Sequence, residues 1–191
     1  MSVRQMKSAI PMAAKGIKPT LTTLGFVRAK RPGVFVRPRP GTDEHEVVWL
    51  FGLSKWSYPG VARSFTVHLG VSIDPEAIYD LGTTATFELE RFLGDGPLIA
   101  EKCTIHNRIV EGFRGKPGNG LVDGDRVAML LSWTVTTNWR GAPEVFWYSE
   151  PEDVELWVEY LGRALPVALA RLSTATLDRS RPAVNLRLPT S

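Results

Sequence analysis

Hydrophobic and polar residues alternate most regularly between Leu24 and Ile73. Every second residue from Phe65 onward is apolar, and the residues between them are small or polar. A period of two places one face of a strand against a core. The alternation predicts four antiparallel strands in this stretch, at 26–30, 34–37, 46–53 and 64–73.

Turn residues separate these strands. Arg31, Pro32 and Gly33 join the first two, because proline presets the turn and glycine supplies positive φ. The strand at 46–53 has apolar side chains on both faces, so we expect it to be central in the sheet.

An amphipathic helix is predicted over 4–24, where apolar residues recur at spacings of three and four. Pro11 and Pro19 each remove a backbone donor, so a break or kink is expected near each, with Pro19 in the first turn of the clearest helical segment. Gly25 is expected to end the helix in the left-handed conformation, with Phe26 folding back on the last turn.

A second helix is predicted over 150–172. Ser149 and Glu152 suggest a capping box, Pro151 suits the first turn, and apolar residues form a stripe along one face. Pro166 is expected to kink or divide the helix. The tail at 173–191 is expected to be flexible.

The middle of the chain is less regular. The segment after Gly82 favours a strand followed by a turn at 94–97, and 103–110 is predicted to be a strand. In 126–137 the front half is compatible with a helix, while β-branched and aromatic residues favour a strand over 132–137. We therefore expect one α+β domain over 1–191, with an antiparallel sheet over 26–137 and the N-terminal and C-terminal helices packed on it.

Composition is typical of a globular protein, with 43% hydrophobic and 23% charged residues. The single cysteine, Cys103, forms no intramolecular disulfide, and the N-terminus lacks the apolar core of a secretory signal. We expect a cytoplasmic protein without a membrane span. An organelle transit peptide is the alternative reading of the acid-free N-terminus.

Charge is unevenly distributed along the chain. Residues 1–42 contain nine Lys or Arg and no Asp or Glu, whereas the remainder has 14 basic and 20 acidic residues, so a net charge of +9 is followed by −6. Such asymmetry suits phosphate or an acidic protein partner. It is also compatible with basic residues that pair with the acidic remainder of the same fold.

Candidate catalytic groups are sparse. Cys103 and His106 form an isolated C-x-x-H, which lacks the four ligands of a typical zinc site and, on a strand, would place the two side chains on opposite faces. His68 lies on the small polar face of its strand, where it could bind a ligand or act as a base, or be a hydrogen-bonded structural residue. The sequence therefore predicts no catalytic set, no metal site and no cofactor.

The remaining candidate is a basic hairpin. Arg28 and Lys30 share a strand face with Phe26, and Arg31 and Arg37 flank the turn. Cations beside aromatic rings suit a phosphate backbone or an acidic protein. Lys55 and Trp56 in a following loop are predicted to extend this binding surface, together with His68.

Three segments, IKPTLTTLGFVRAKRPGVFVR, VVWLFGLSKW and FTVHLGV, resemble the bacterial domain of unknown function 4304 family over residues 17–73. That family shows a helix ending in Leu-x-x-Leu-Gly-Phe, a basic strand, a hydrophobic strand leading to a Gln-Lys or Ser-Lys pair, and a strand reading Phe-Thr-Val-Asn-Leu-Gly. His68 departs from the usual Asn, 78–149 cannot be aligned, and LPVALARL from Leu165 is loosely similar to the closing helix. The resemblance implies an α+β fold and a bacterial cytoplasmic location, and carries no activity. The matching residues are Leu21, Leu24, Gly25, Phe26, Lys55, Trp56, Phe65, Thr66, Val67, Leu69 and Gly70.

These observations predict a non-enzymatic module that binds a protein partner through the sheet edge and the basic hairpin, as an immunity or accessory factor would. Nucleic-acid binding through the same hairpin is one alternative. A small-molecule or hydrolytic site around His68 is another. The sequence leaves the oligomeric state open.

Overall fold

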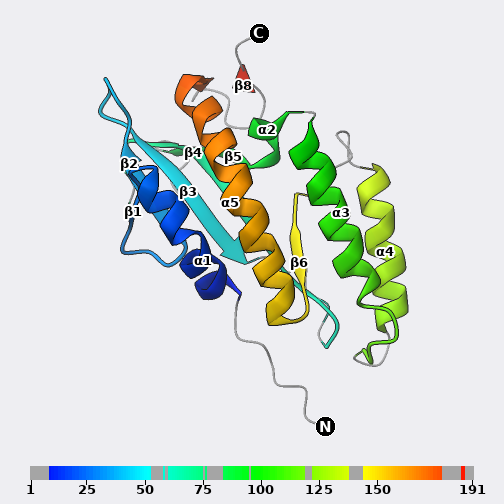
Figure 1. The fold of residues 1–191 in the computed structure, drawn as a ribbon. Coiled ribbons are helices and arrows are strands. Elements are labelled where there is room, and N and C mark those ends of the chain that lie inside the picture. Colours follow the sequence, from blue (N-terminus) through cyan, green and yellow to red (C-terminus); the bar gives the residue numbers. More distant parts are fainter. Residues whose placement is uncertain are drawn as a thin grey trace.

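The computed structural model of this chain describes residues 9–52, 58, 60–74, 76, 84–94, 96–118, 122–137, 144–177 and 186–187, with the side chains of 133–137, 176–177 and 186–187 excepted. These residues form a six-stranded antiparallel sheet with helices packed against it (Figure 1). The predicted α+β class, with N-terminal and C-terminal helices on the sheet, is confirmed.

The sheet follows the order of the chain for five strands and then adds a sixth. Strands β1 to β5 are neighbours in sequence order, and β6 pairs with β4 beside β5. β3 lies between β2 and β4, as its two apolar faces predicted. The strands are β1 (Val27–Arg28), β2 (Val34–Pro38), β3 (His45–Gly52), β4 (Arg63–Ser72), β5 (Thr84–Glu88) and β6 (Phe146–Tyr148).

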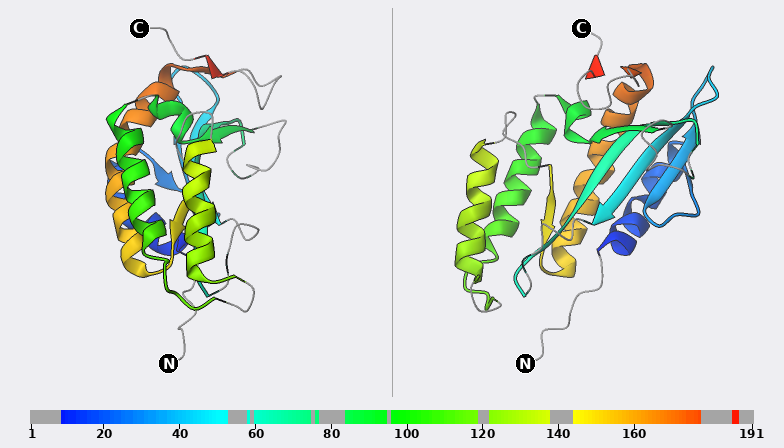
Figure 2. Two further views of the ribbon diagram at one scale, coloured as in Figure 1. Left: turned by 90° about the vertical axis from the view of Figure 1, so that its right-hand side faces the viewer. Right: turned by 180° about the vertical axis from the view of Figure 1, so that it is seen from behind.

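The main core lies between one face of the sheet and two helices, α1 (Ile10–Thr23) and α5 (Pro151–Thr174). The odd-numbered residues of β4 from Phe65 to Val71 are buried in this core. Ile17 of α1 and Trp157 of α5 belong to the same core and are fully buried. Figures 1 and 2 show α1 and α5 lying together across this face.

Gly16 allows α1 and α5 to approach closely, and Gly162 lies at the next turn of the same contact. A Cβ at Gly16 would lie 2.6 Å from Val158 Cγ1, and one at Gly162 would lie 3.8 Å from Thr20 Oγ1. Gly16 faces Val158, and Thr20, four residues later, faces Gly162, also four residues later. The two helices therefore run in the same direction. Small residues at a crossing let the backbones approach, and here they place both helices against the sheet.

Gly25 ends α1 as predicted. Its φ is +83°, and the N–H of Phe26 donates to the Leu21 carbonyl at 2.9 Å while the Gly25 N–H donates to Thr22 at 3.0 Å. This pair of bonds is the Schellman arrangement. The expected break at Pro19 is wrong, because α1 runs through this residue. Packing against α5 on both sides of Pro19 offsets the missing backbone donor.

The C-terminal helix begins one residue later than its predicted capping box. Asp153 Oδ2 accepts the N–H groups of Ser149 and Glu150, at 2.7 and 3.0 Å, so Glu150 and Asp153 form the box instead of Ser149 and Glu152. The helix also continues through Pro166 without division. Buried residues in the turns on both sides of Pro166 hold it together.

The predicted strand at 103–110 is wrong, because Pro97–Glu111 forms α3. Its buried residues Lys102, His106, Ile109 and Val110 recur at helical spacing, although β-branched residues are frequent. The predicted strand at 132–137 is also wrong, since Gly124–Thr137 is the single helix α4. The sheet expected over 26–137 is therefore interrupted by helices.

The strand predicted after Gly82 is observed, whereas the turn predicted at 94–97 includes Asp95, which lies outside the described residues. β5 leads into a short helix, α2 (Glu90–Leu93), and Gly94 takes a φ of +66°. Two short strands, β7 (Thr176–Leu177) and β8 (Leu186–Arg187), pair after α5. The remainder of the predicted flexible tail, and residues 1–8 of the predicted first helix, lie outside the described residues.

Gly16→Ala tests the close packing of α1 on α5. An unrestricted Gly→Ala change in a helix stabilises by about 1 kcal/mol. Overpacking against Val158 costs about 1–3 kcal/mol, so we expect a net loss of stability in urea unfolding. Adding Val158→Ala should relieve the contact and make the Gly16→Ala change favourable. A Gly16→Ala protein that is more stable than wild type with Val158 intact would contradict this packing.

Candidate functional site

β3 extends past the first residue of β2, and among the described residues this part of its edge has no partner strand. The last register pair between them is Val34 with Trp49, and the Leu50 N–H donates to the Gly33 carbonyl at 2.8 Å. On its other side, β3 continues to pair with β4 as far as Gly52. Among the described residues, no strand pairs with the β2 side of Gly52.

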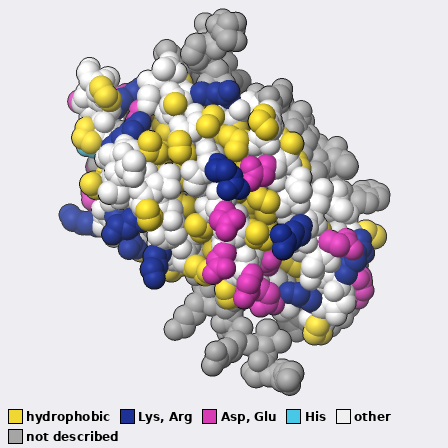
Figure 3. Space-filling model, viewed as in Figure 1, with side chains coloured by type: hydrophobic (Ala, Val, Ile, Leu, Met, Phe, Trp, Pro, Cys, Tyr) yellow, Lys and Arg dark blue, Asp and Glu magenta, His cyan; other side chains and the backbone are white. Residues whose placement is uncertain are grey.

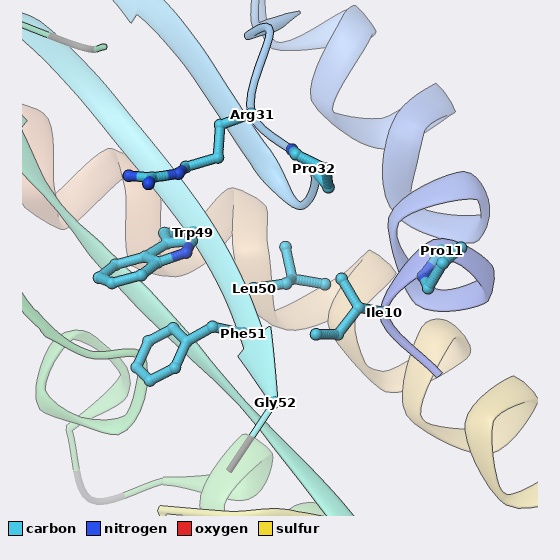
Figure 4. Close-up of a pocket in the computed structure, with 8 residues that line it drawn as sticks. All are labelled: Ile10, Pro11, Arg31, Pro32, Trp49, Leu50, Phe51 and Gly52. Atoms are coloured by element: carbon cyan, nitrogen blue, oxygen red, sulfur yellow. The ribbon is translucent and has the colours of Figure 1, made fainter. Parts of the chain in front are cut away.

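A groove of about 390 Å³ lies at this open edge (Figure 4). The N-terminal turn of α1 forms one wall and the β1–β2 turn forms another, with the end of β3 as the floor. The groove thus joins three segments that are separated in sequence. Its lining residues are Ile10, Pro11, Arg31, Pro32, Trp49, Leu50, Phe51 and Gly52.

The two sides of the groove differ in chemistry. Leu50 points to the same side as Ile10, giving an aliphatic surface (Figure 4). Trp49 and Phe51 point to the opposite side, with ring centroids 4.2 Å apart, and the Arg31 guanidinium lies on this side. Alternation along β3 therefore creates one aliphatic wall and one aromatic, cationic wall.

Gly33 is required in the turn that bounds the groove. Its φ is +78°, and a Cβ there would lie 2.4 Å from the Leu50 carbonyl oxygen. Both observations exclude a side chain, because the left-handed conformation and the close backbone approach each favour glycine. The predicted positive φ at this turn is confirmed.

Exposed cations lie on the two segments that form the walls of the groove, α1 and the β1–β2 hairpin. Lys15 lies one helical turn after Pro11, Lys30 directly precedes Arg31, and Lys18 and Arg28 are also exposed. Figure 3 shows Lys and Arg gathered on the side of the molecule that carries α1 and the β1–β2 hairpin. We call Lys15, Lys18, Arg28 and Lys30 the cationic rim.

Arg37, another of the predicted binding residues, is engaged within the fold. Its Nε donates to Glu46 Oε2 at 2.7 Å and its Nη1 to the Leu24 carbonyl at 2.6 Å. The Glu46 side chain is fully buried, and the guanidinium also lies 4.7 Å from the centre of the Phe26 ring. Arg37 therefore neutralises a buried carboxylate and ties α1 to the sheet.

His68 lies on the aromatic side of the sheet, next to the groove. Its ring packs edge-on against Phe51, with the centroids 4.8 Å apart. Burial lowers the pKa of His68, which the nearby Glu88 carboxylate opposes and Arg91 reinforces. The imidazole is therefore neutral at neutral pH. Lys55 and Trp56, predicted to extend the binding surface, lie outside the described residues.

A buried ion pair is the feature that the sequence did not indicate. Lys102 on α3 is fully buried and donates through Nζ to Glu90 Oε1 on α2, while its ammonium lies 3.7 Å from the centre of the Phe146 ring. Burial lowers the pKa of Lys102, and Glu90 opposes this shift. Helical spacing from Lys102 to His106 is the signal that would have indicated an inward-facing lysine.

Glu90 Oε2, both ring nitrogens of His106 and the hydroxyl of the fully buried Tyr160 have no hydrogen-bond partner among the described residues. Burial is the main cause that raises the pKa of Tyr160, and the charge of Glu90 adds to it. Burying these polar and charged groups lowers the stability of the fold, because their lost contacts with water are not all replaced by hydrogen bonds.

Cys103 and His106 lie on one helix and do not form a reactive pair. His106 is fully buried, whereas Cys103 is partly exposed, and burial raises the pKa of its thiol. Within the described residues, no three His, Cys, Asp or Glu side chains are grouped so as to hold a metal ion. Likewise, no helix among the described residues is long and apolar enough to cross a membrane.

Comparisons with known proteins give no match for this chain, whether with protein families, curated sequences or solved structures. The resemblance to the domain of unknown function 4304 family therefore stays a prediction.

Replacing one member of the buried ion pair should lower the free energy of unfolding more than replacing both. Lys102→Met leaves the Glu90 carboxylate buried without its partner, which costs about 3–5 kcal/mol. Adding Glu90→Gln removes the uncompensated charge and should recover a large part of the loss. Urea unfolding of the two variants and wild type measures this difference. Equal stability of the single and double variants would contradict the role assigned to the pair.

His106 should make the protein sensitive to acid. Burial lowers its pKa from 6.5 to about 4, with Lys102 nearby adding to the shift and the backbone of Leu131 opposing it. Between these values the unfolded chain binds more protons, so stability falls as pH falls from 6.5 to 4, by about 3 kcal/mol.

The variant His106→Gln should remove this contribution, so its stability should fall less than that of wild type over the same pH range. His68 also has a lowered pKa, so His68→Gln is measured alongside to separate its contribution from that of His106. Parallel pH profiles for wild type and His106→Gln, measured by urea unfolding, would rule out His106 as the group responsible.

Proposed function

We propose that this protein is a non-enzymatic binding module that holds an acidic, extended segment of a partner protein in the groove at the end of β3. The observation that supports this most directly is that, in the described part of the chain, the edge of β3 at Gly52 has no partner strand and faces a groove whose lining includes Arg31. An unpaired strand edge is a template for a peptide backbone, and main-chain hydrogen bonds provide affinity in such complexes. An immunity or accessory factor would use a surface of this kind.

The sign of the charge favours an acidic partner. The cationic rim belongs to α1 and the β1–β2 hairpin, the two segments that form the walls of the groove, and residues 1–42 contain no acidic side chain to neutralise it locally. Complementary charge increases the rate of encounter and suppresses basic partners. The groove therefore selects for negative charge before any detailed contact forms.

A protein segment fits this surface better than nucleic acid. Most of the residues that line the groove are apolar, and Arg31 is the only cation among them. Arg37 and Arg39, which would otherwise add to a phosphate-binding surface, form ion pairs with Glu46 and Glu44. The rim thus retains fewer cations than the sequence of residues 1–42 suggests, and a phosphate backbone would lose the contacts that dominate its affinity.

A site centred on His68 is less well supported. Its neutral ring packs against Phe51 and lies within 6.2 Å of Trp49, measured between ring centroids. These contacts are typical of a side chain that fills the surface of a sheet. His68 contributes to the proposed function by supporting the aromatic wall of the groove.

Selection from a display library of short random peptides tests the proposal. The full chain should enrich peptides with a net negative charge. A peptide enriched in the selection is then synthesised. The double variant Arg28→Glu and Lys30→Glu should bind it about tenfold more weakly than wild type, because two attractive charges become repulsive. Fluorescence anisotropy of the labelled peptide gives the dissociation constants.

Arg108→Glu on α3 is the control for charge reversal, since Arg108 is exposed and lies outside the groove. It should leave the affinity within about twofold of wild type. Enrichment of uncharged or basic peptides, or equal weakening by the control, would refute the proposed site. Tight binding of single-stranded or duplex DNA with a steep loss at higher salt would instead favour nucleic-acid binding.

A further inference from the structure

The backbone at the end of β3 specifies how a peptide would bind in the groove. In an antiparallel sheet, the N–H and C=O groups of residues two apart point toward the same neighbouring strand. The Leu50 N–H already donates to Gly33 on the β2 side. The N–H and C=O of Gly52 therefore point to this side too, where the groove lies.

We infer that the partner segment adds to β3 as an antiparallel strand, exchanging a pair of hydrogen bonds with Gly52 and presenting an aliphatic residue followed by an acidic one. This inference rests on the proposed function and states its mode of recognition. The segment would continue the line of β2, which is itself antiparallel to β3.

The residue opposite Gly52 is assigned to the aliphatic side. Register partners in a sheet place their side chains on the same face, and Gly52 shares its face with Leu50. That face of the groove contains Ile10, whose Cδ1 lies 3.4 Å from the position of a Cβ at Gly52. A Leu, Ile or Val of the partner would cover these aliphatic groups and exclude water from the hydrogen bonds.

The next residue of the segment is assigned to the cationic side. It lies opposite Phe51, so its side chain shares the face of Phe51 and Trp49, where Figure 4 shows the Arg31 guanidinium. An Asp or Glu there would approach Arg31 and Lys30 in the β1–β2 turn. Charge-assisted hydrogen bonds to a guanidinium are among the stronger contacts that a peptide can form.

The β1–β2 turn limits the strand in one direction. A residue two positions after the aliphatic one would lie opposite Leu50, whose N–H is already taken by Gly33. The segment must therefore end or turn away after its acidic residue. A segment with the aliphatic residue before the acidic one should therefore bind differently from a segment with the reverse order. The reverse order would place the carboxylate against Ile10 and Leu50.

Synthetic peptides test this mode directly. The capped peptide Ac-STVTLDGS-amide carries the inferred order, and Ac-STVTDLGS-amide has the same composition and charge in the reverse order. Binding of each to the full wild-type chain is measured by fluorescence anisotropy. The first peptide should bind about tenfold more tightly than the second, because only its carboxylate reaches Arg31.

Backbone methylation provides a second measurement. N-methylation of the leucine in the first peptide removes the N–H that would donate to the Gly52 carbonyl, and should weaken binding by about tenfold. N-methylation of the preceding threonine, whose N–H points away from β3, should change the affinity by less than about twofold.

The failures of this inference and of the proposed function are distinguishable. If both peptides bind equally and Arg28→Glu with Lys30→Glu weakens both, the acidic-segment function stands and strand addition is overturned. Equal effects of the two methylations would likewise overturn strand addition. If neither these peptides nor peptides selected for negative charge bind to the chain, both proposals are wrong.

Discussion

The hydrogen bonding of β4 is the constraint on which the rest of the structure depends. This ten-residue strand pairs with β3 along one side, and both β5 and β6 share its other side. Buried backbone groups need partners, so the two shorter strands must be brought to one edge even though α2, α3 and α4 separate them in sequence. At the junction, the Leu89 N–H donates to Val67 and the Thr66 hydroxyl to the Glu144 carbonyl, at 3.0 and 3.1 Å.

This junction also explains why charged groups lie inside the protein. The chain leaves β5 directly into α2, whose first residue is Glu90, and returns as β6 with Phe146 beneath the Lys102 ammonium. A buried pair of this kind contributes little net stability, because desolvation offsets much of the attraction between the charges. It does disfavour arrangements in which α2 and α3 are displaced, since either charge alone would be stranded in the core.

The basic residues of the N-terminal part serve two purposes. Arg37 and Arg39 pair with glutamates of the same fold and connect the hairpin to the end of α5 through Ser173 and Ala175. Arg28 and Lys30 instead lie on or beside β1, the edge strand of the sheet, where charges also discourage uncontrolled pairing between sheets. The same cations that protect this edge therefore bias the nearby groove toward acidic segments.

The sequence by itself determined the α+β class, the strands up to β4, the glycine turn at Gly33 and the end of α1 at Gly25, because these depend on local alternation and on backbone conformations that glycine favours. It also indicated the cations around the hairpin. Only the tertiary structure decided that 103–110 and 132–137 are helical, because β-branched residues suit either state until their burial is known. The groove and the Glu90–Lys102 pair each join segments distant in sequence, so no local pattern contains them.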